Sequence, residues 1–491
     1  MRRLRQPPPR RAVAWAGLAL VAGPALVLAV PEAALGHALV GKQDLPIPAW
    51  LFAWGASLVL IVSFAVLSIA WRSPKLTEER WRPSAGWLSA LANGPVTQAV
   101  TGLIGALLLV VVIYTGLEGT EAPDRNFSIT FVFVTFWLGL VLLSVLFGDV
   151  FKSFNPWRAV GRAFGGVFRL AAGQSAPPPL SYPERLGHWP AVVGIVAFVW
   201  LELIYGTGVT LGLRPETVGI AALTYSAITF VAMALFGVEK WIERGEAFSV
   251  YFRMFSRLSL FEVRDGRLGR RRFLTGAPSW GEIGGSLALV LVTIGVTTFD
   301  GGSEGALDSP LNSTFDLMRD IGFGIVPAFR LSGSIWMAIV LAGVALLYMI
   351  GIRGMHTVKG APPVRELARS FAHTMIPIAL AYLVAHYFSL FVFQEQAQFT
   401  YLLSDPLGDG SDLFGTASSG VDYGLIGATG VWYVQVAALV IGHVTALTLA
   451  HDRAVTIWKD PQLAARSQYW MLAVMVGFTC LGLYLLSQAN A

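Results

Sequence analysis

Three ionisable side chains fall near the middle of long apolar segments, where a charged group costs several kcal/mol and is therefore a functional candidate. They are Glu202, His386 and His443. Two histidines and one carboxylate are the smallest set that can hold Zn²⁺ or Fe²⁺ with an open coordination position. Such a metal would supply hydroxide for hydrolysis, and Tyr205 or Tyr382 would polarise an oxygen of the substrate. The same residues also fit a proton or ion relay, or structural hydrogen bonds between helices.

The spacing around His443 indicates which way its ring faces. Small residues recur at every fourth position of this segment, from Ala438 to Ala450. Such a stripe allows two membrane helices to pack closely. His443 lies in the neighbouring stripe, so we expect its ring to face into a helix bundle. Tyr382 precedes His386 by one helical turn and shares its face.

A second candidate group lies where apolar segments meet basic loops. His373 begins one segment, and His451 and Asp452 end the next one. A His–Asp pair can orient an imidazole for base catalysis or for metal binding. The alternative is structural, because the helix dipole favours a histidine near a helix C-terminus. Asp149, at the corresponding end of another segment, is a further candidate for this group.

The composition places these residues in a membrane protein. Of 491 residues, 55% are apolar and only 13% are charged, which is about half the charged share of a soluble domain. This excludes a soluble multidomain enzyme and a disordered chain. The apolar runs are roughly twenty residues long and do not alternate, so they predict helices rather than a β-barrel. The single cysteine, Cys480, excludes an intrachain disulfide.

The predicted architecture is an all-α, polytopic transmembrane bundle of about ten helices that follows an N-terminal signal segment. Residues 1–36 combine basic residues, an apolar run over 12–30 and a small-x-small site, which is typical of a signal peptide or a signal anchor. Residues 37–491 then form one membrane domain. Its apolar spans are about 48–71, 96–117, 129–150, 190–211, 217–236, 283–299, 332–352, 370–394, 431–450 and 469–487.

The placement of basic residues predicts how the bundle is oriented. Of the 35 Lys and Arg residues, all but those at positions 42, 125, 214, 319 and 330 fall in alternate segments between the spans. The positive-inside rule places these basic segments in the cytoplasm and both mature termini outside a bacterial inner membrane. The net charge of +5 therefore orients the protein and faces anionic lipid, and it requires no nucleic acid.

The loops carry further expectations. Amphipathic stretches near 157–171 and 246–260 predict two helices that lie on the inner leaflet. His188 and His356, in basic loops, are expected to be solvated. The opposite loops, 300–331 and 395–430, are acidic. Clustered carboxylates can hold Ca²⁺, but the spacing is not that of an EF-hand, so we expect solvated loops. Their acidic residues include Asp300, Asp405, Asp409, Asp412 and Asp422.

Two other patterns bear on function. His37 would become the N-terminal residue if a signal peptide were removed after Gly36. A terminal amine and an imidazole of one residue can chelate copper, so a membrane copper-handling protein is one alternative. No GxxxxGK[ST] or HExxH motif occurs, which argues against bound nucleotide and ATP-driven transport.

Three stretches resemble a known family. They are residues 37–55, 146–159 and 442–454, which include the HALVGKQDLPIPAW, LFGDVF and AHDRA sequences. Together they are similar to the multipass membrane proteins of actinobacteria that are labelled fenitrothion hydrolase, over most of residues 37–491. The resemblance implies hydrolysis of a lipophilic organophosphate, with no catalytic residue carried over. The expected partners are therefore the lipid bilayer and a lipophilic small molecule or an ion, and the alternative function is a proton- or metal-ion-coupled transporter or channel.

Overall fold

The computed structural model describes residues 49–489, except for 77–80, 173–178, 207–212 and 304. The predicted signal segment and His37 lie outside the described residues.

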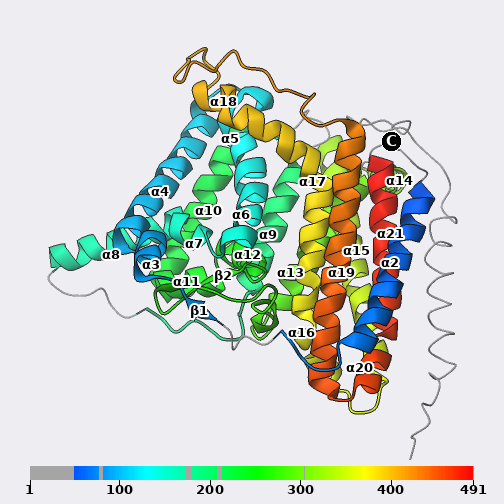
Figure 1. Cartoon of the computed structure of the whole chain (residues 1–491). Helices are drawn as coiled ribbons and strands as arrows, with labels where there is room; N and C mark the ends of the chain where they lie inside the picture. The colour runs from blue at the N-terminus through cyan, green and yellow to red at the C-terminus, as the bar shows by residue number, and fades with distance from the viewer. Residues whose placement is uncertain (1–48, 77–80, 173–178, 207–212, 304, 490–491) are drawn as a thin grey trace, which may run out of the picture.

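Long helices form the body of the molecule (Figure 1). Within the described chain, eight helical segments are long and apolar enough to cross a membrane. A bent pair of helices makes a ninth such segment if the pair is counted as one span. The apolar helix Trp189–Tyr205 is shorter than these segments. This confirms the predicted all-α transmembrane bundle, and each of the ten predicted spans from 48–71 onward overlaps one of these helices. They are α2 (Ala49–Ala70), α4 (Pro95–Glu118), α5 with η4 and α6 (Phe127–Thr130, Phe131–Gly139 and Leu140–Phe147), α9 with η5 (Trp189–Trp200 and Leu201–Tyr205), α10 (Pro215–Phe236), α13 (Ser286–Ser303), α15 (Ile325–His356), η7 with α17 and α18 (Ala372–Met375, Ile376–Phe399 and Tyr401–Ser404), α19 (Ala428–Trp458), and the bent pair α20 and α21 (Pro461–Ser467 and Tyr469–Ala489).

Short elements connect these helices. A small antiparallel sheet has the strand order β1-β3-β2, and Arg82 of β1 and Phe261 of β2 both pair with Arg270 of β3. The sequence predicted no strands, because none of them exceeds four residues. The connecting elements are α3 (Gly86–Asn93), η3 (Pro123–Arg125), α7 (Phe151–Phe154), α8 (Pro156–Ala172), α11 (Val238–Arg244), α12 (Ala247–Ser256), η6 (Ala277–Ser279), α14 (Asp308–Asp320), α16 (Val364–Ser370) and the strands β1 (Arg82–Pro83), β2 (Phe261–Arg264) and β3 (Arg267–Arg270).

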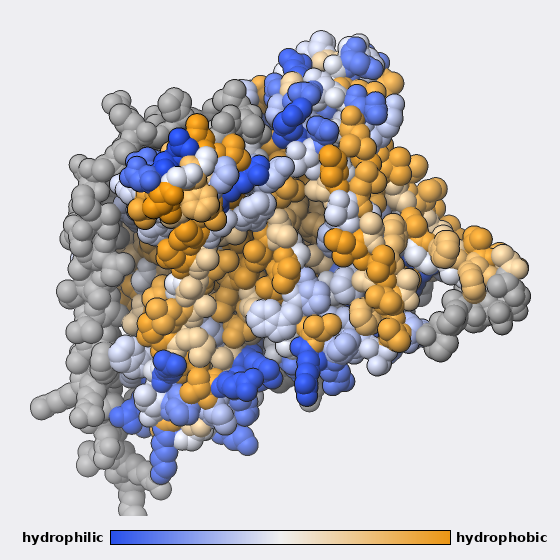
Figure 2. All heavy atoms as spheres, turned by 180° about the vertical axis from the view of Figure 1, so that it is seen from behind, coloured by the Kyte–Doolittle hydropathy of each residue, from blue (hydrophilic) through white to orange (hydrophobic). Residues whose placement is uncertain are grey.

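The bundle has two chemically different ends. The sheet, α8, α16 and α20 lie toward one end, and α14, α18 and the 405–427 loop lie toward the other (Figure 1). We name them the basic end and the acidic end after the loops that they carry. Figure 2 shows a broad hydrophobic surface with hydrophilic residues gathered above and below it. This distribution is that of a protein embedded in lipid, since water would not favour so large an apolar surface.

Close helix packing explains the stripe of small residues around His443. Helix α19 packs against α17 along much of its length. A Cβ atom at Gly442 would lie only 2.2 Å from the Cβ of Ala381 and 2.8 Å from the carbonyl oxygen of Pro377. Only glycine allows this approach, which confirms that the small face of α19 is a packing face.

The two amphipathic stretches have different surroundings. Helix α8 presents an exposed apolar face that includes Phe164 and Val167, as expected for a helix on a lipid surface. Helix α12 is instead buried within the protein, and the exposure of Tyr251 and Phe252 is 0%. The predicted surface helix near 246–260 is therefore a core element. Its aromatic side chains pack against those of η4 and α9, and periodicity alone cannot distinguish these partners from lipid.

The structure also corrects the prediction that His188 is solvated. Its side chain is buried just before α9, stacks on Trp280, and places Nδ1 3.1 Å from the hydroxyl of Ser286. Burial foremost, and then nearby arginines such as Arg253, lower the pKa of His188 to about 3. His188 therefore remains neutral at physiological pH. His356, by contrast, is exposed, as predicted.

This shifted pKa predicts a pH dependence of stability. Below about pH 6.5 the unfolded chain binds a proton at His188 that the folded chain rejects, so stability should fall as the pH falls toward 3. The contribution is at most about 1.4 kcal/mol per pH unit. Thermal unfolding of the detergent-solubilised protein should show a shallower pH dependence for His188→Asn than for the wild type. His356→Asn is the matched control and should keep the full dependence; equal slopes for both variants would contradict the assignment.

Candidate functional site

A hydrogen-bonded group of three side chains lies inside the bundle, where α13 packs against α17. Asp300 lies in the last turns of α13, and its Oδ2 is 2.8 Å from Nε2 of His386 in α17. The hydroxyl of Tyr387 donates a hydrogen bond of 2.5 Å to the same oxygen. The side chains of His386 and Asp300 are only 21% and 15% exposed. One carboxylate oxygen is thus shared by an imidazole and a phenol, an arrangement that can hold and pass a proton.

The backbone of α13 leaves room for this contact. A Cβ atom at residue 301 would lie 3.3 Å from Nδ1 of His386. Glycine at this position therefore lets the imidazole approach α13 without displacement. His386 and Tyr387 are consecutive on α17, and both reach the same oxygen of Asp300.

Glu202 lies next to this group without bonding to it. Its carboxylate interacts electrostatically with Asp300 and with the phenols of Tyr251 and Tyr387. It has no hydrogen bond or ion pair with any described residue. The hydroxyl of Tyr251 is likewise buried and has no hydrogen-bond partner in the described chain. Glu202 is therefore a second carboxylate that interacts with this group through electrostatics alone.

Two π-helical turns hold the residues around this cluster. Glu202 lies in η5, and the neighbouring π-helical segment η4 contains Thr135. The hydroxyl of Thr135 donates a 3.0 Å hydrogen bond to Glu395, another carboxylate on α17. A π turn widens a helix and is frequently found at functional sites. No sequence pattern predicts these π-helical segments, because their residues continue the apolar composition of the helices that precede them.

His443 is the predicted member that stays outside the cluster. Its ring is fully buried, as predicted, and its Nδ1 lies 2.8 Å from the carbonyl oxygen of Leu439 on its own helix. The ring also packs against Tyr382 at a centroid distance of 6.2 Å. Its Nε2 has no hydrogen-bond partner among the described residues.

The structure does not assemble the predicted metal centres. Within the described chain, no three His, Cys, Asp or Glu side chains form a group that could hold a metal ion. This applies to Glu202, His386 and His443, because His386 turns toward Asp300 and His443 bonds to its own helix.

The two tyrosines proposed to polarise a substrate are engaged elsewhere. The ring of Tyr205 lies against the guanidinium of Arg330, 3.9 Å from its centroid. The hydroxyl of Tyr382 donates a 2.7 Å hydrogen bond to the carbonyl oxygen of Phe478. Tyr382 nevertheless lines a small cavity with His386, Thr297 and Thr298, with a volume of about 30 Å³. This is room for about one water molecule beside the imidazole.

The second predicted group has a structural role at the basic end. Asp452 accepts hydrogen bonds from the indole of Trp71 at 2.8 Å and from the backbone N–H of Lys75 at 2.6 Å. His451 places Nε2 3.0 Å from the carbonyl oxygen of Trp71. These contacts attach the chain after α2 to α19. His373 is buried at the start of its helix, and together with His451 and Asp452 it forms no metal-binding group in the described chain.

Asp300 and Tyr387 are the functional candidates that sequence reasoning missed. The predicted span ended at residue 299, which placed Asp300 in a solvated loop, whereas α13 continues to Ser303. The length of the predicted span could have revealed this, because 17 residues are few for a helix that crosses a bilayer and the helix should therefore extend further. Comparisons with protein-family models, curated proteins and solved structures found no match, so the arrangement of these side chains must itself indicate the function.

Proposed function

We propose that the protein is a multipass membrane transporter or channel that moves protons, with Asp300, His386 and Tyr387 as its proton-binding group. The observation that supports this most is the shared Oδ2 of Asp300, which faces both Nε2 of His386 and the hydroxyl of Tyr387 inside the bundle. We also propose that the basic end faces the cytoplasm, as the positive-inside rule implies.

The chemistry of the proposed relay follows from the contacts. A proton bound at Nε2 of His386 moves along the hydrogen bond to Oδ2 of Asp300, which leaves a neutral imidazole and a neutral carboxyl group. Tyr387 stabilises Asp300 in its ionised form by donating its own hydrogen bond. Glu202 is the next acceptor, because two neighbouring carboxylates repel each other when both are charged and a proton on either relieves this. Tyr251 of α12, which interacts electrostatically with Glu202, is the next polar group beyond it.

Hydrolysis of an organophosphate, which the sequence resemblance implies, is the second proposal. A carboxylate that orients an imidazole is also the arrangement of a general base, and the cavity beside His386 has room for a water molecule. The same cavity favours the proton relay, since about 30 Å³ accommodates water and not a lipophilic organophosphate.

Proton movement through reconstituted protein tests the first proposal. Proteoliposomes that contain a pH-sensitive dye should acidify when an inward proton gradient is applied, and His386→Ala should slow this by roughly tenfold or more. His356→Ala, an exposed histidine at the basic end, is the matched control and should conduct as the wild type does. Flux in His386→Ala equal to that of the wild type, or wild-type vesicles no leakier than empty ones, would overturn the proposal.

A further inference from the structure

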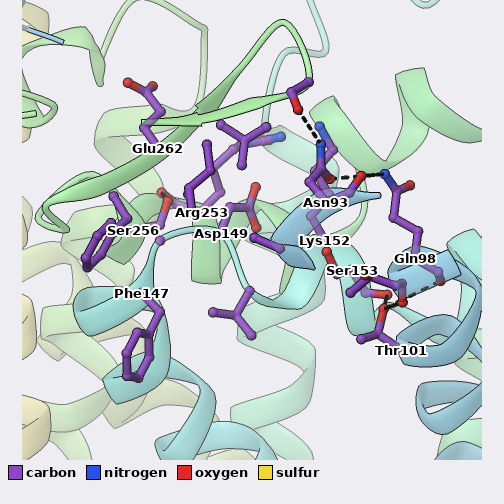
Figure 3. A pocket seen from close by; sticks show the side chains of 18 of the residues that line it. Asn93, Gln98, Thr101, Phe147, Asp149, Lys152, Ser153, Arg253, Ser256 and Glu262 are labelled. Carbon is purple, nitrogen blue, oxygen red and sulfur yellow. Dashed lines mark hydrogen bonds between the residues drawn. The ribbon is translucent and has the colours of Figure 1, made fainter. Parts of the chain in front are cut away.

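A large cavity opens at the basic end, away from the intramembrane cluster. Its volume is about 560 Å³, which lies within the range of small-molecule sites. Its walls come from the end of α3 and the start of α4, the turn between α6 and α7, the end of α12, and the hairpin formed by β2 and β3. The hairpin tip is attached to α3, because the side-chain amide of Asn93 donates to the carbonyl oxygen of Gly266 (Figure 3).

The lining of this cavity is predominantly cationic. Three carboxylates line it, from Asp149, Glu262 and Asp265. Five basic residues oppose them, namely Lys152, Arg158, Arg253, Arg257 and Arg271. The cavity therefore favours an anion.

Two of these cations keep capacity for a ligand. Lys152 is exposed and forms no ion pair with any described residue. The Nε of Arg257 is buried without a hydrogen-bond partner in the described chain, and its Nη1 lies 3.5 Å from a carboxylate oxygen of Glu262, beyond hydrogen-bond length for a strong pair. Figure 3 shows Arg253 beside Asp149 within the cavity, and the two groups attract each other electrostatically. Lys152 and Arg257 are thus the cations least satisfied by the protein itself.

Two exposed apolar side chains also line the cavity. They are Leu91 of α3 and Phe147 of α6, which are 65% and 58% exposed. Each belongs to a helical segment that is long and apolar enough to cross a membrane. A ligand with an anionic head and a hydrocarbon tail would satisfy the cations and cover these two side chains together.

We propose that this cavity binds the phosphate headgroup of an anionic phospholipid. Lys152 and Arg257 contact the phosphate oxygens, and Leu91 and Phe147 contact the first part of the acyl chains. Basic pockets between membrane helices on the cytoplasmic side recognise anionic headgroups in this way. The proposal does not depend on the proton relay.

Lipid retention by the full-length protein tests this proposal. Protein purified in a neutral detergent should bind phosphatidylglycerol in preference to phosphatidylcholine, measured by native mass spectrometry. A double variant, Lys152→Gln with Arg257→Gln, should weaken the retention of phosphatidylglycerol by about tenfold. The matched control is Arg353→Gln with Lys359→Gln, two exposed basic residues at the same end, and it should retain the lipid.

Two further measurements distinguish a lipid from a soluble phosphate as the ligand, and separate a loss of binding from misfolding of the variant. Glycerol 3-phosphate should compete poorly, because it lacks the acyl chains. If it binds as tightly as the lipid and depends on the same residues, the cavity is a site for a soluble phosphate and the lipid proposal fails. Lys152→Gln alone changes one exposed side chain, so it covers the case in which the double variant does not fold. Unchanged phosphatidylglycerol retention in either folded cavity variant, or no preference over phosphatidylcholine, would overturn the proposal.

Discussion

Replacing Asp300 by asparagine is expected to reduce proton flux by roughly 100-fold, the largest loss of any single change in the intramembrane group. Asparagine has the size of aspartate and an oxygen that accepts the hydrogen bonds of His386 and Tyr387, so the packing of α13 against α17 should survive. It cannot take up the proton. The measurement is dye acidification in proteoliposomes, with thermal unfolding of the same preparation as the check on folding.

A series of variants separates proton chemistry from structure at this position. Tyr387→Phe removes one hydrogen bond of Asp300 and keeps the carboxylate, so its flux should fall by less than that of Asp300→Asn. Asp300→Glu restores a titratable group and should recover part of the flux. If Asp300→Asn unfolds, its loss of flux does not test the proton pathway. The comparison of proton flux between Tyr387→Phe and the wild type then tests whether the group around Asp300 takes part. A folded Asp300→Asn that conducts normally would exclude Asp300 from the pathway.

The organophosphate alternative makes a different prediction for the same residues. As a general base, His386 would need a substrate beside it, and hydrolysis would fall in Asp300→Asn whether or not vesicles conduct protons. A folded protein that hydrolyses an organophosphate without moving protons would favour the second proposal. Proton flux without hydrolysis would favour the first.

The membrane architecture could be predicted because hydropathy acts over about twenty residues at a time. The apolar runs of α2 and α10 can each be recognised as a membrane span without knowledge of the helices around them. Glu202, His386 and His443 could be singled out for the same reason, since each interrupts such a run. The buried orientation of His443 could be predicted from the small residues on α19. These residues indicate a packing face, but they do not indicate which helix packs against it.

The partners of these residues could not be predicted. The apolar span ends at residue 299, which predicts a loop at Asp300, yet α13 continues past it to Ser303. The helix tolerates the carboxylate because His386 and Tyr387, almost ninety positions away in the sequence, donate to it. One sequence contains no information that pairs these positions. The predicted metal site failed to assemble for the same reason, since residue type and depth do not determine which helices are neighbours.

Helix α12 shows a related limit. Its arginines and aromatic residues recur with the period of a helix, a pattern that predicts one face in water and one in lipid. In the structure Arg253 lines the cavity at the basic end, and Tyr251 packs on Trp137 in the core. An internal polar cavity and a membrane surface produce the same amphipathic pattern.

The largest expected loss of stability comes from Glu246, the residue that fixes the start of α12. Its carboxylate is fully buried and accepts hydrogen bonds from the hydroxyl of Tyr225 at 2.5 Å and from the amide of Asn155 at 3.0 Å. It also accepts from the backbone N–H groups of Phe248 and Ser249. Glu246→Ala would leave four buried donors without this acceptor, at about 1 kcal/mol or more for each.

We therefore expect Glu246→Ala to lower the free energy of unfolding by about 3 kcal/mol or more, measured as a fall in the thermal midpoint in detergent. Glu243→Ala is the control, because that side chain is 52% exposed and its removal should change stability by about 0.5 kcal/mol at most. Equal midpoints for the two variants would contradict the role of Glu246. Since α12 carries Tyr251 beside Glu202 and Arg253 and Arg257 in the cavity, the same change should weaken both proton flux and lipid retention. Glu246 touches neither site, so this double loss would show that α12 positions both.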